Sequence, residues 1–197
     1  MIKDNILEVR KRVICACRRA KRDAAAIRLV AVSKNRSAEE IKEALLAGLT
    51  DFGENRVQEA AAKYRELSAI KWHMVGHLQT NKVKQAVKIF DLIQSVDSLR
   101  LMKEINKQAA RIGKIQAILI EVKLSPEATK FGIKPDETAG VIKEAAVFKN
   151  IHIKGLMTIA PVLDNPQKSR PYFRGLRELR DKINALPVTR YQFYLWA

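Results

Sequence analysis

Short apolar runs alternate with helical patterns along most of this chain. Residues 2–22 predict an amphipathic helix, since Ile2, Ile6, Val9 and Val13 recur at helical spacing. Six units follow, and each consists of an apolar run, typical of a strand, and then a helical pattern. The predicted strands cover residues 27–33, 51–54, 72–76, 92–96, 115–124 and 151–159, and the predicted helices cover 37–48, 56–68, 80–89, 98–112, 135–148 and 166–186.

The predicted strands are apolar throughout, whereas a half-exposed antiparallel sheet would show alternating polar residues. We therefore predict an α/β fold with a parallel sheet wrapped in helices, either as a barrel or as a doubly wound sheet. Helix boundaries agree, because Ser37 is a suitable N-cap, Gly48 follows the same helix and Pro135 opens another. A chain of 197 residues suits one sizeable domain and is short for two, so we predict a single domain over 1–197.

Polar residues gather at the point where each predicted strand ends. In parallel α/β folds, ligands bind at the carboxyl ends of the strands, where the following loops begin. One rim of the sheet would therefore collect Lys34, Asn55, His77 and several hydroxyl groups, which makes this rim a candidate ligand site. The polar segments are residues 33–35, 53–55, 76–79, 95–98, 125–130 and 157–161.

Lys34 directly follows the first predicted strand, whose small and β-branched residues are typical of a strand buried on both faces. A lysine at a strand end is commonly a solvated surface group, so position alone leaves a structural and a chemical role open. Glu54 also has two interpretations: a general base, or a carboxylate that neutralises a cation at a neighbouring strand end. We favour the neutralising role for Glu54.

The remaining candidates have structural interpretations. His73 and His77 have the i,i+4 spacing of a zinc pair, but His73 falls within a predicted strand and no third ligand stands at a suitable spacing. We therefore predict no metal site. Trp72, Phe52 and Phe131 are expected in the core rather than as platforms for stacking a ligand.

The chain is strongly basic, with 37 Lys and Arg against 21 Asp and Glu and a formal charge of +16. Such a charge is compatible with a nucleic-acid partner, yet the basic residues are spread along the chain and no aromatic cluster is available to stack bases. Cys15 and Cys17, at i,i+2 in a helix, form neither a disulfide framework nor a metal quartet and suit a reducing cytoplasm. The N-terminal segment has no apolar stretch typical of a signal peptide or membrane span.

Several exact strings stand at these strand ends: VSKN (32–35), FGENRVQE (52–59), WHMVGHLQTNK (72–82), SVDS (95–98), EATKFGI (127–133) and GLMTIAP (155–161). Together they resemble the YggS/PROSC-type family of pyridoxal 5′-phosphate homeostasis proteins, which is related in fold to the N-terminal barrel domain of alanine racemase. The resemblance covers residues 2–192. It implies a TIM-type (β/α)₈ barrel and ranks a small cofactor above a nucleic acid as the partner, so we expect no nucleic-acid partner. The cysteines and the N-terminal segment favour a cytoplasmic protein with no membrane partner.

The resemblance also implies a cofactor and its site. Lys34, which matches the lysine of the family's VSK string, would carry pyridoxal phosphate as an aldimine, and Asn55 of the FGEN block would lie near the ring. His77 and Met157 are further candidates for lining the cofactor site. Apolar walls around Lys34 would favour the neutral amine that attacks an aldehyde.

The family is thought to bind, buffer and deliver the vitamin B6 cofactor, with PLP-dependent apo-enzymes as partners, so we expect no turnover. An amino-acid racemase of the same fold type is the catalytic alternative, and a basic nucleic-acid-binding protein is a third interpretation.

The chain departs from the family pattern at its C-terminus. The sequence YQFYLWA occupies the place where a seventh strand should begin, and the last two β/α units are missing. In the family those units hold the cofactor phosphate, so we expect weakened cofactor binding and a monomer or weak self-association. Permitted codons for residues 193–197, read in another frame, encode the family's Leu-Ser-Met-Gly-Met. A frameshift origin of residues 194–197 is therefore a hypothesis that the nucleotide sequence would decide.

Overall fold

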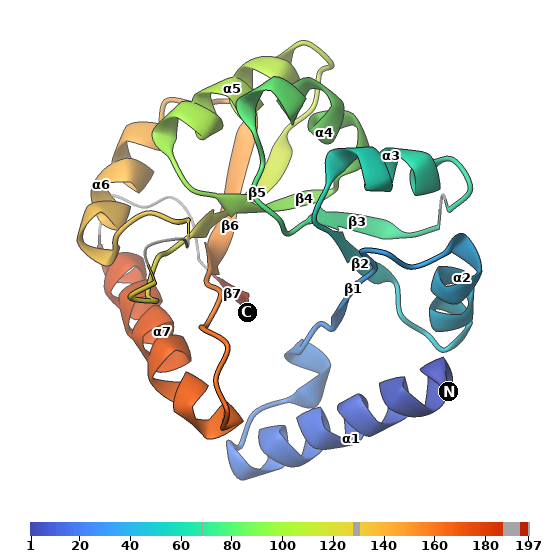
Figure 1. Ribbon diagram of the computed structural model, residues 1–197. Coiled ribbons are helices and arrows are strands. Elements are labelled where there is room, and N and C mark those ends of the chain that lie inside the picture. Colours follow the sequence, from blue (N-terminus) through green and yellow to red (C-terminus); the bar gives the residue numbers. More distant parts are fainter. Residues whose placement is uncertain (68, 128–130, 187–193, 197) are drawn as a thin grey trace. The chain divides into compact units, whose positions relative to one another are not determined.

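The computed structural model describes residues 1–67, 69–127, 131–186 and 194–196 (Figure 1). The chain divides into two parts, Met1–His73 and Met74–Ala197. In each part, strands and helices alternate as the hydrophobic pattern predicts. Within the described ranges, no helix combines the length and the apolar character that crossing a membrane requires.

The first part opens with a long helix and continues in β–α units. The paired strands β1 and β2 run parallel, with Val32 opposite Gly53, and Lys71 N donates to Thr50 O at the start of β3 (2.9 Å). The elements are α1 (Ile2–Arg19), the 3-10 helix η1 (Ala24–Ala26), β1 (Val30–Val32), α2 (Ala38–Leu46), β2 (Asp51–Glu54), α3 (Val57–Tyr64) and β3 (Lys71–Met74), whose last residue belongs to the second part.

Helix α2 is flanked by the two residues, Ser37 and Gly48, that the sequence predicts at its ends. Ser37 Oγ accepts from Glu40 N while the Glu40 side chain accepts from Ser37 N, which completes a capping box. At the other end Gly48 has φ +83°, a left-handed conformation that glycine adopts without steric cost. The short connection that follows leads directly into β2.

The prediction of a first strand buried on both faces is wrong. β1 covers only three residues; Val30 and Ala31 are half-buried, and Val32 is 51% exposed. Burial of a strand depends on neighbours along both edges and both faces, and within the first part β1 pairs along one edge only, with β2. Apolar composition indicates that a segment tends to form a strand, but it does not indicate which other elements cover that strand.

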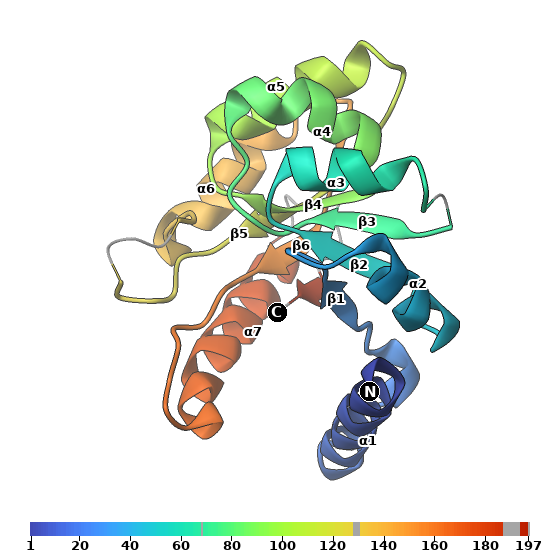
Figure 2. The same cartoon turned by 45° about the vertical axis from the view of Figure 1, so that its right-hand side comes forward.

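The second part contains four parallel strands in sequence order. β4 pairs with β5, β5 with β6 and β6 with β7, and the side chains of Ile118, Leu119 and Ile153 are fully buried. Figures 1 and 2 show α4 and α5 along one side of β4 and β5. The elements are η2 (Thr80–Lys82), α4 (Val83–Ile89), β4 (Leu92–Val96), α5 (Leu99–Ala110), β5 (Gln116–Glu121), α6 (Pro135–Ala145), β6 (Ile151–Met157), η3 (Pro166–Ser169), α7 (Arg170–Asn184) and β7 (Tyr194–Trp196).

The last strand is short. β7 spans three residues, with Leu195 opposite Leu156 of β6, and lies where the sequence predicts that a seventh strand begins. Of the segment YQFYLWA, residues 191–193 and 197 lie outside the described residues. The frameshift hypothesis for residues 194–197 stays a prediction, because it concerns the nucleotide sequence.

Candidate functional site

Lys34 lies in a tight turn that leaves the end of β1. Arg36 N donates to Ser33 O (3.1 Å), and Asn35 adopts φ +58°, which asparagine tolerates better than most residues. The Lys34 side chain is exposed, and its ammonium has no hydrogen bond or ion pair with any residue that the structure describes. A primary amine is therefore presented at the carboxyl end of the strand.

The expectation that apolar walls surround Lys34 is wrong. Lys34 stands two positions beyond Val32, the last residue of β1, and the buried position at the strand end is occupied by Ser33 instead. The chain turns directly after Ser33, and Asn35 is already in the left-handed region. Exposure makes the amine accessible to a dissolved aldehyde.

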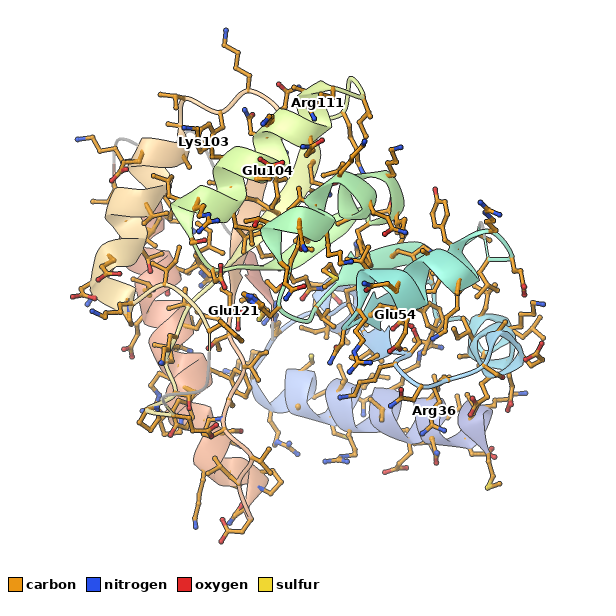
Figure 3. The ribbon with its side chains drawn as sticks, turned by 45° about the horizontal axis from the view of Figure 1, so that its top comes forward. Arg36, Glu54, Lys103, Glu104, Arg111 and Glu121 are labelled. Atoms are coloured by element: carbon orange, nitrogen blue, oxygen red, sulfur yellow. The ribbon has the colours of Figure 1, made fainter. Side chains whose placement is uncertain are left out.

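Next to the turn, a network links the side chains of Ser33, directly after β1, Glu54 of β2 and Lys63 of α3. Ser33 Oγ donates to Glu54 Oε1 (2.7 Å), and Lys63 Nζ donates to the same oxygen (2.7 Å) and to Ser33 O (2.8 Å). Glu54 is fully buried at the end of β2, and Figure 3 shows it beside α3, the helix that carries Lys63. The network connects the Lys34 turn to the second strand and to the helix that follows it.

The predicted neutralising role of Glu54 is confirmed, but its partner differs from the expected one. The cation is Lys63 of α3 rather than a residue at a neighbouring strand end. Sequence reasoning missed Lys63, although a signal was present: Lys63 stands three residues after the buried Ala60 and six after the buried Val57, on the apolar face of the helix. A lysine on such a face generally requires a buried partner.

Asn55 follows β2 as Lys34 follows β1. Since Val32 is opposite Gly53 in the parallel pair, Lys34 and Asn55 each stand two residues beyond this pair, at the same edge. Asn55 is half-buried. The structure thus brings together the two residues of the first part that the sequence analysis places at the site, while their roles stay predictions.

In the second part, His77 is held between a carboxylate and an aromatic ring. His77 Nδ1 lies 3.1 Å from Asp97 Oδ2, and the imidazole stacks on Phe131 with ring centroids 3.8 Å apart and planes at 14°. When Nδ1–H donates to Asp97, Nε2 is left to meet a ligand. The expectation of Phe131 in the core is wrong, because this ring is 51% exposed, whereas Trp72 and Phe52 are buried as predicted.

Met157 ends β6 in a packed environment. Its side chain is 4% exposed and lies in a hydrophobic cluster with Leu92 and Leu119. The neighbouring Thr158 Oγ1 donates to Val122 O (2.8 Å), so the strand end is fixed by both apolar and polar contacts. His77 follows β3 and Met157 ends β6, and the place of both residues near a cofactor stays a prediction. Lys130 of the predicted KFG turn lies outside the described residues.

Comparisons with known proteins agree on one family. The family described as "Alanine racemase, N-terminal domain" matches residues 11–192. The pyridoxal phosphate homeostasis protein of Aquifex aeolicus is 41% identical over 182 residues, which cover 91% of this chain and 80% of the relative. The protein of the same name from Pseudomonas aeruginosa is 34% identical and covers 93% of this chain and 80% of its own length.

Solved structures give the same result. PipY of Synechococcus elongatus with PLP bound superposes with a TM-score of 0.84 at 32% identity, covering 99% of this chain and 87% of PipY. Alanine racemase of Clostridium difficile reaches a TM-score of 0.71 at 16% identity over 86% of this chain and 48% of the enzyme, which shows a shared fold. These likenesses confirm the predicted barrel of the alanine racemase type. The chain therefore belongs to the family of the pyridoxal phosphate homeostasis proteins.

Proposed function

We propose that this protein binds pyridoxal phosphate covalently through Lys34 and releases it intact to acceptor proteins, without turning over a substrate. The observation that carries the proposal is the exposed, unpaired amine of Lys34 at the end of β1, in a chain of this family. PipY, a relative with 32% identity, has a structure with PLP bound.

The residues of the first part fit an aldehyde-bearing cofactor. When bound, the cofactor supplies an aldehyde that reacts with a primary amine. Lys34 would hold the cofactor through its amine: condensation with the aldehyde carbon would form a C=N bond and release the aldehyde oxygen as water. Asn55, at the same edge, can donate or accept a hydrogen bond through its half-buried amide and so orient the ring.

The candidates of the second part would line the cofactor in this proposal. His77 offers Nε2 as a hydrogen-bonding atom whose direction Asp97 and Phe131 hold. Met157 offers a buried apolar surface at the end of β6. The contacts of His77 and Met157 fix the orientation of each side chain, which suits a site that binds one small molecule in one orientation.

Cofactor titration tests the attachment. Purified protein is mixed with pyridoxal phosphate, reduced with borohydride and digested, and the modified peptide is located by mass spectrometry. We expect the adduct at Lys34 and its loss in Lys34→Ala, while Lys42→Ala, which removes an exposed lysine of α2, keeps it. An adduct spread evenly over surface lysines, or unchanged in Lys34→Ala, would contradict the proposal.

The absence of turnover is a separate part of the proposal. The relatives are named for homeostasis of the cofactor rather than for a reaction. A racemase must remove and return the α-proton of an amino acid, so it exchanges this proton with solvent. We expect cofactor-loaded protein in deuterated water to label the α-carbon of alanine no faster than Lys34→Ala does. Faster labelling would favour the racemase alternative.

Delivery of the cofactor implies PLP-dependent apo-enzymes as partners. We expect loaded protein to reactivate an apo-enzyme in the presence of a scavenger that consumes free pyridoxal phosphate. Reactivation that the scavenger abolishes would show release into solution and contradict direct delivery.

We further propose a cytoplasmic, single-domain protein that is monomeric or weakly self-associating and binds no nucleic acid. Cys15 and Cys17 are free thiols, as a reducing compartment favours. One cooperative unfolding transition would support a single domain, and light scattering would measure the oligomeric state. Retention on DNA or RNA that weakens with salt and ignores pyridoxal phosphate would favour the nucleic-acid alternative instead.

A further inference from the structure

All three polar groups of Ser33, which are its amide, its hydroxyl and its carbonyl, form hydrogen bonds. Its amide donates to Gly53 O (2.8 Å), its hydroxyl donates to Glu54 Oε1 (2.7 Å), and its carbonyl accepts from Lys63 Nζ (2.8 Å). The same carbonyl accepts Arg36 N (3.1 Å) and so closes the turn that carries Lys34. Every polar group of Ser33 is therefore used to fix the position of this turn.

Two of these contacts come from the Glu54–Lys63 ion pair, whose burial is energetically unfavourable. The Glu54 side chain is 0% exposed and that of Lys63 is 15% exposed. Taking two charges out of water costs several kcal/mol per ion, and their attraction offsets this cost only when the geometry is good and the remaining polar atoms are satisfied. Glu54 Oε2 has no hydrogen-bond partner in the part of the chain that the structure describes. Stability alone is therefore a poor explanation of this pair.

The contacts point to the Lys34 turn as the reason for the pair. Lys63 Nζ joins Glu54 to the Ser33 carbonyl, and that carbonyl is also the acceptor that closes the turn. Asn35 adopts φ +58° in this turn, a left-handed conformation that asparagine tolerates better than most residues. Loss of the pair would remove Lys63 from the Ser33 carbonyl and Glu54 from the Ser33 hydroxyl, leaving only Arg36 N on the carbonyl and a longer contact to Gly53 O (3.3 Å) on the hydroxyl, and so let the turn relax toward other conformers.

We propose that the Glu54–Lys63 ion pair is a positioning device that holds the Lys34 turn in the conformer from which the amine attaches to an aldehyde cofactor. This inference rests on the proposed function, because it assigns Lys34 as the point of attachment. Glu54 and Lys63 act through the backbone of Ser33, without contact to the cofactor. Their effect is therefore on the covalent step rather than on the affinity for the cofactor's ring and phosphate.

Two ligands distinguish an effect on covalent attachment from an effect on the affinity for the cofactor. Pyridoxal phosphate binds and attaches, whereas pyridoxamine phosphate has an amine in place of the aldehyde and can only bind. In Lys63→Met and Glu54→Gln we expect the rate of attachment at Lys34 to fall by about tenfold, the effect of a modest conformational equilibrium. The dissociation constant of pyridoxamine phosphate should stay within about twofold of the wild-type value.

Two further variants exclude a general loss of structure. Lys114→Met is the matched control, because Lys114 is a half-buried lysine of the second part that donates to two main-chain carbonyls, Val87 O and Phe90 O (2.8 Å each). The double variant Glu54→Leu with Lys63→Met replaces the ion pair by apolar side chains, a change that commonly leaves stability intact. We expect wild-type attachment in the control and slow attachment in the folded double variant.

The outcomes are distinct. Slow attachment with unchanged pyridoxamine phosphate binding supports the positioning role. Wild-type attachment in the double variant overturns it, and so does a parallel weakening of both ligands, which would show a purely structural pair. Attachment in the wild-type protein at a residue other than Lys34 would overturn the proposed function, and with it the role of the pair.

Discussion

The imidazole of His77 stacks on the phenyl ring of Phe131, with centroids 3.8 Å apart and planes at 14°. The two residues come from segments far apart in the sequence, the connection after β3 and the loop before α6. Asp97 holds the other edge of the same imidazole at 3.1 Å. A histidine held in this way presents its free nitrogen in one direction, which suits recognition of a ligand.

Removal of the phenyl ring should free the imidazole. We expect Phe131→Ala to shift the NMR signals of the His77 ring protons downfield, because stacked protons are shielded by the ring, and to lower stability by only about 1 kcal/mol at a half-exposed site. If His77 lines the cofactor site, affinity for pyridoxamine phosphate falls as well. Unchanged His77 signals would show that the stack is not populated in solution.

Removal of one member of the buried ion pair should be costly. Glu54→Ala leaves the ammonium of Lys63 without its carboxylate, so we expect a loss of about 3–5 kcal/mol in the free energy of unfolding. Urea denaturation measures this loss. Lys168→Ala, which removes an exposed partner of Asp164, is the control and should change stability by less than about 1 kcal/mol. Equal losses in the two variants would mean that Glu54 is solvated.

The N-cap of α2 allows a test close to the Lys34 turn. Ser37→Ala removes the acceptor for Glu40 N and should cost about 1 kcal/mol of stability. Ser169→Ala is the comparison, because Ser169 precedes α7 without a side-chain cap bond, and a smaller loss is expected. Thermal unfolding of both variants checks the difference.

Two glycines should respond to alanine in opposite ways. At Gly132, φ is +123° and a Cβ would lie 2.7 Å from Lys123 N, so Gly132→Ala must displace the backbone and should lower the melting temperature clearly. Gly140 lies within α6 with nothing within 4 Å of its Cβ position, so Gly140→Ala should stabilise the protein by about 0.5–1 kcal/mol. A stable Gly132→Ala protein would contradict the described loop.

Most of the fold could be predicted because its signals are local. The strands at 51–54 and 92–96 appear at the predicted bounds, and the Ser37 cap is found as expected. The other elements start or end a few residues from their predicted bounds, as frayed helix ends and short strands usually do. Hydrophobic periodicity and capping depend on neighbours within one turn or one strand, so the chain carries this information directly.

The candidate site was only partly predictable. Lys34, Asn55 and His77 were identified by their places after predicted strands, but the burial of Lys34 and of Phe131 was predicted wrongly. The partner Lys63 was missed, whereas Asp97 was placed at the rim within residues 95–98 without its contact to His77. Exposure depends on which other elements cover a residue, and no local pattern encodes that coverage.

The sequence by itself determined the alternation of strands and helices, the lysine at the end of the first strand and the family to which the strings belong. Only the tertiary structure decided that Lys63, 30 residues beyond Ser33, donates hydrogen bonds to both Ser33 and Glu54 next to the Lys34 turn. The physical reason is the range of the interactions. Backbone propensities act between near neighbours, whereas a buried charge finds its partner only after distant segments have packed together.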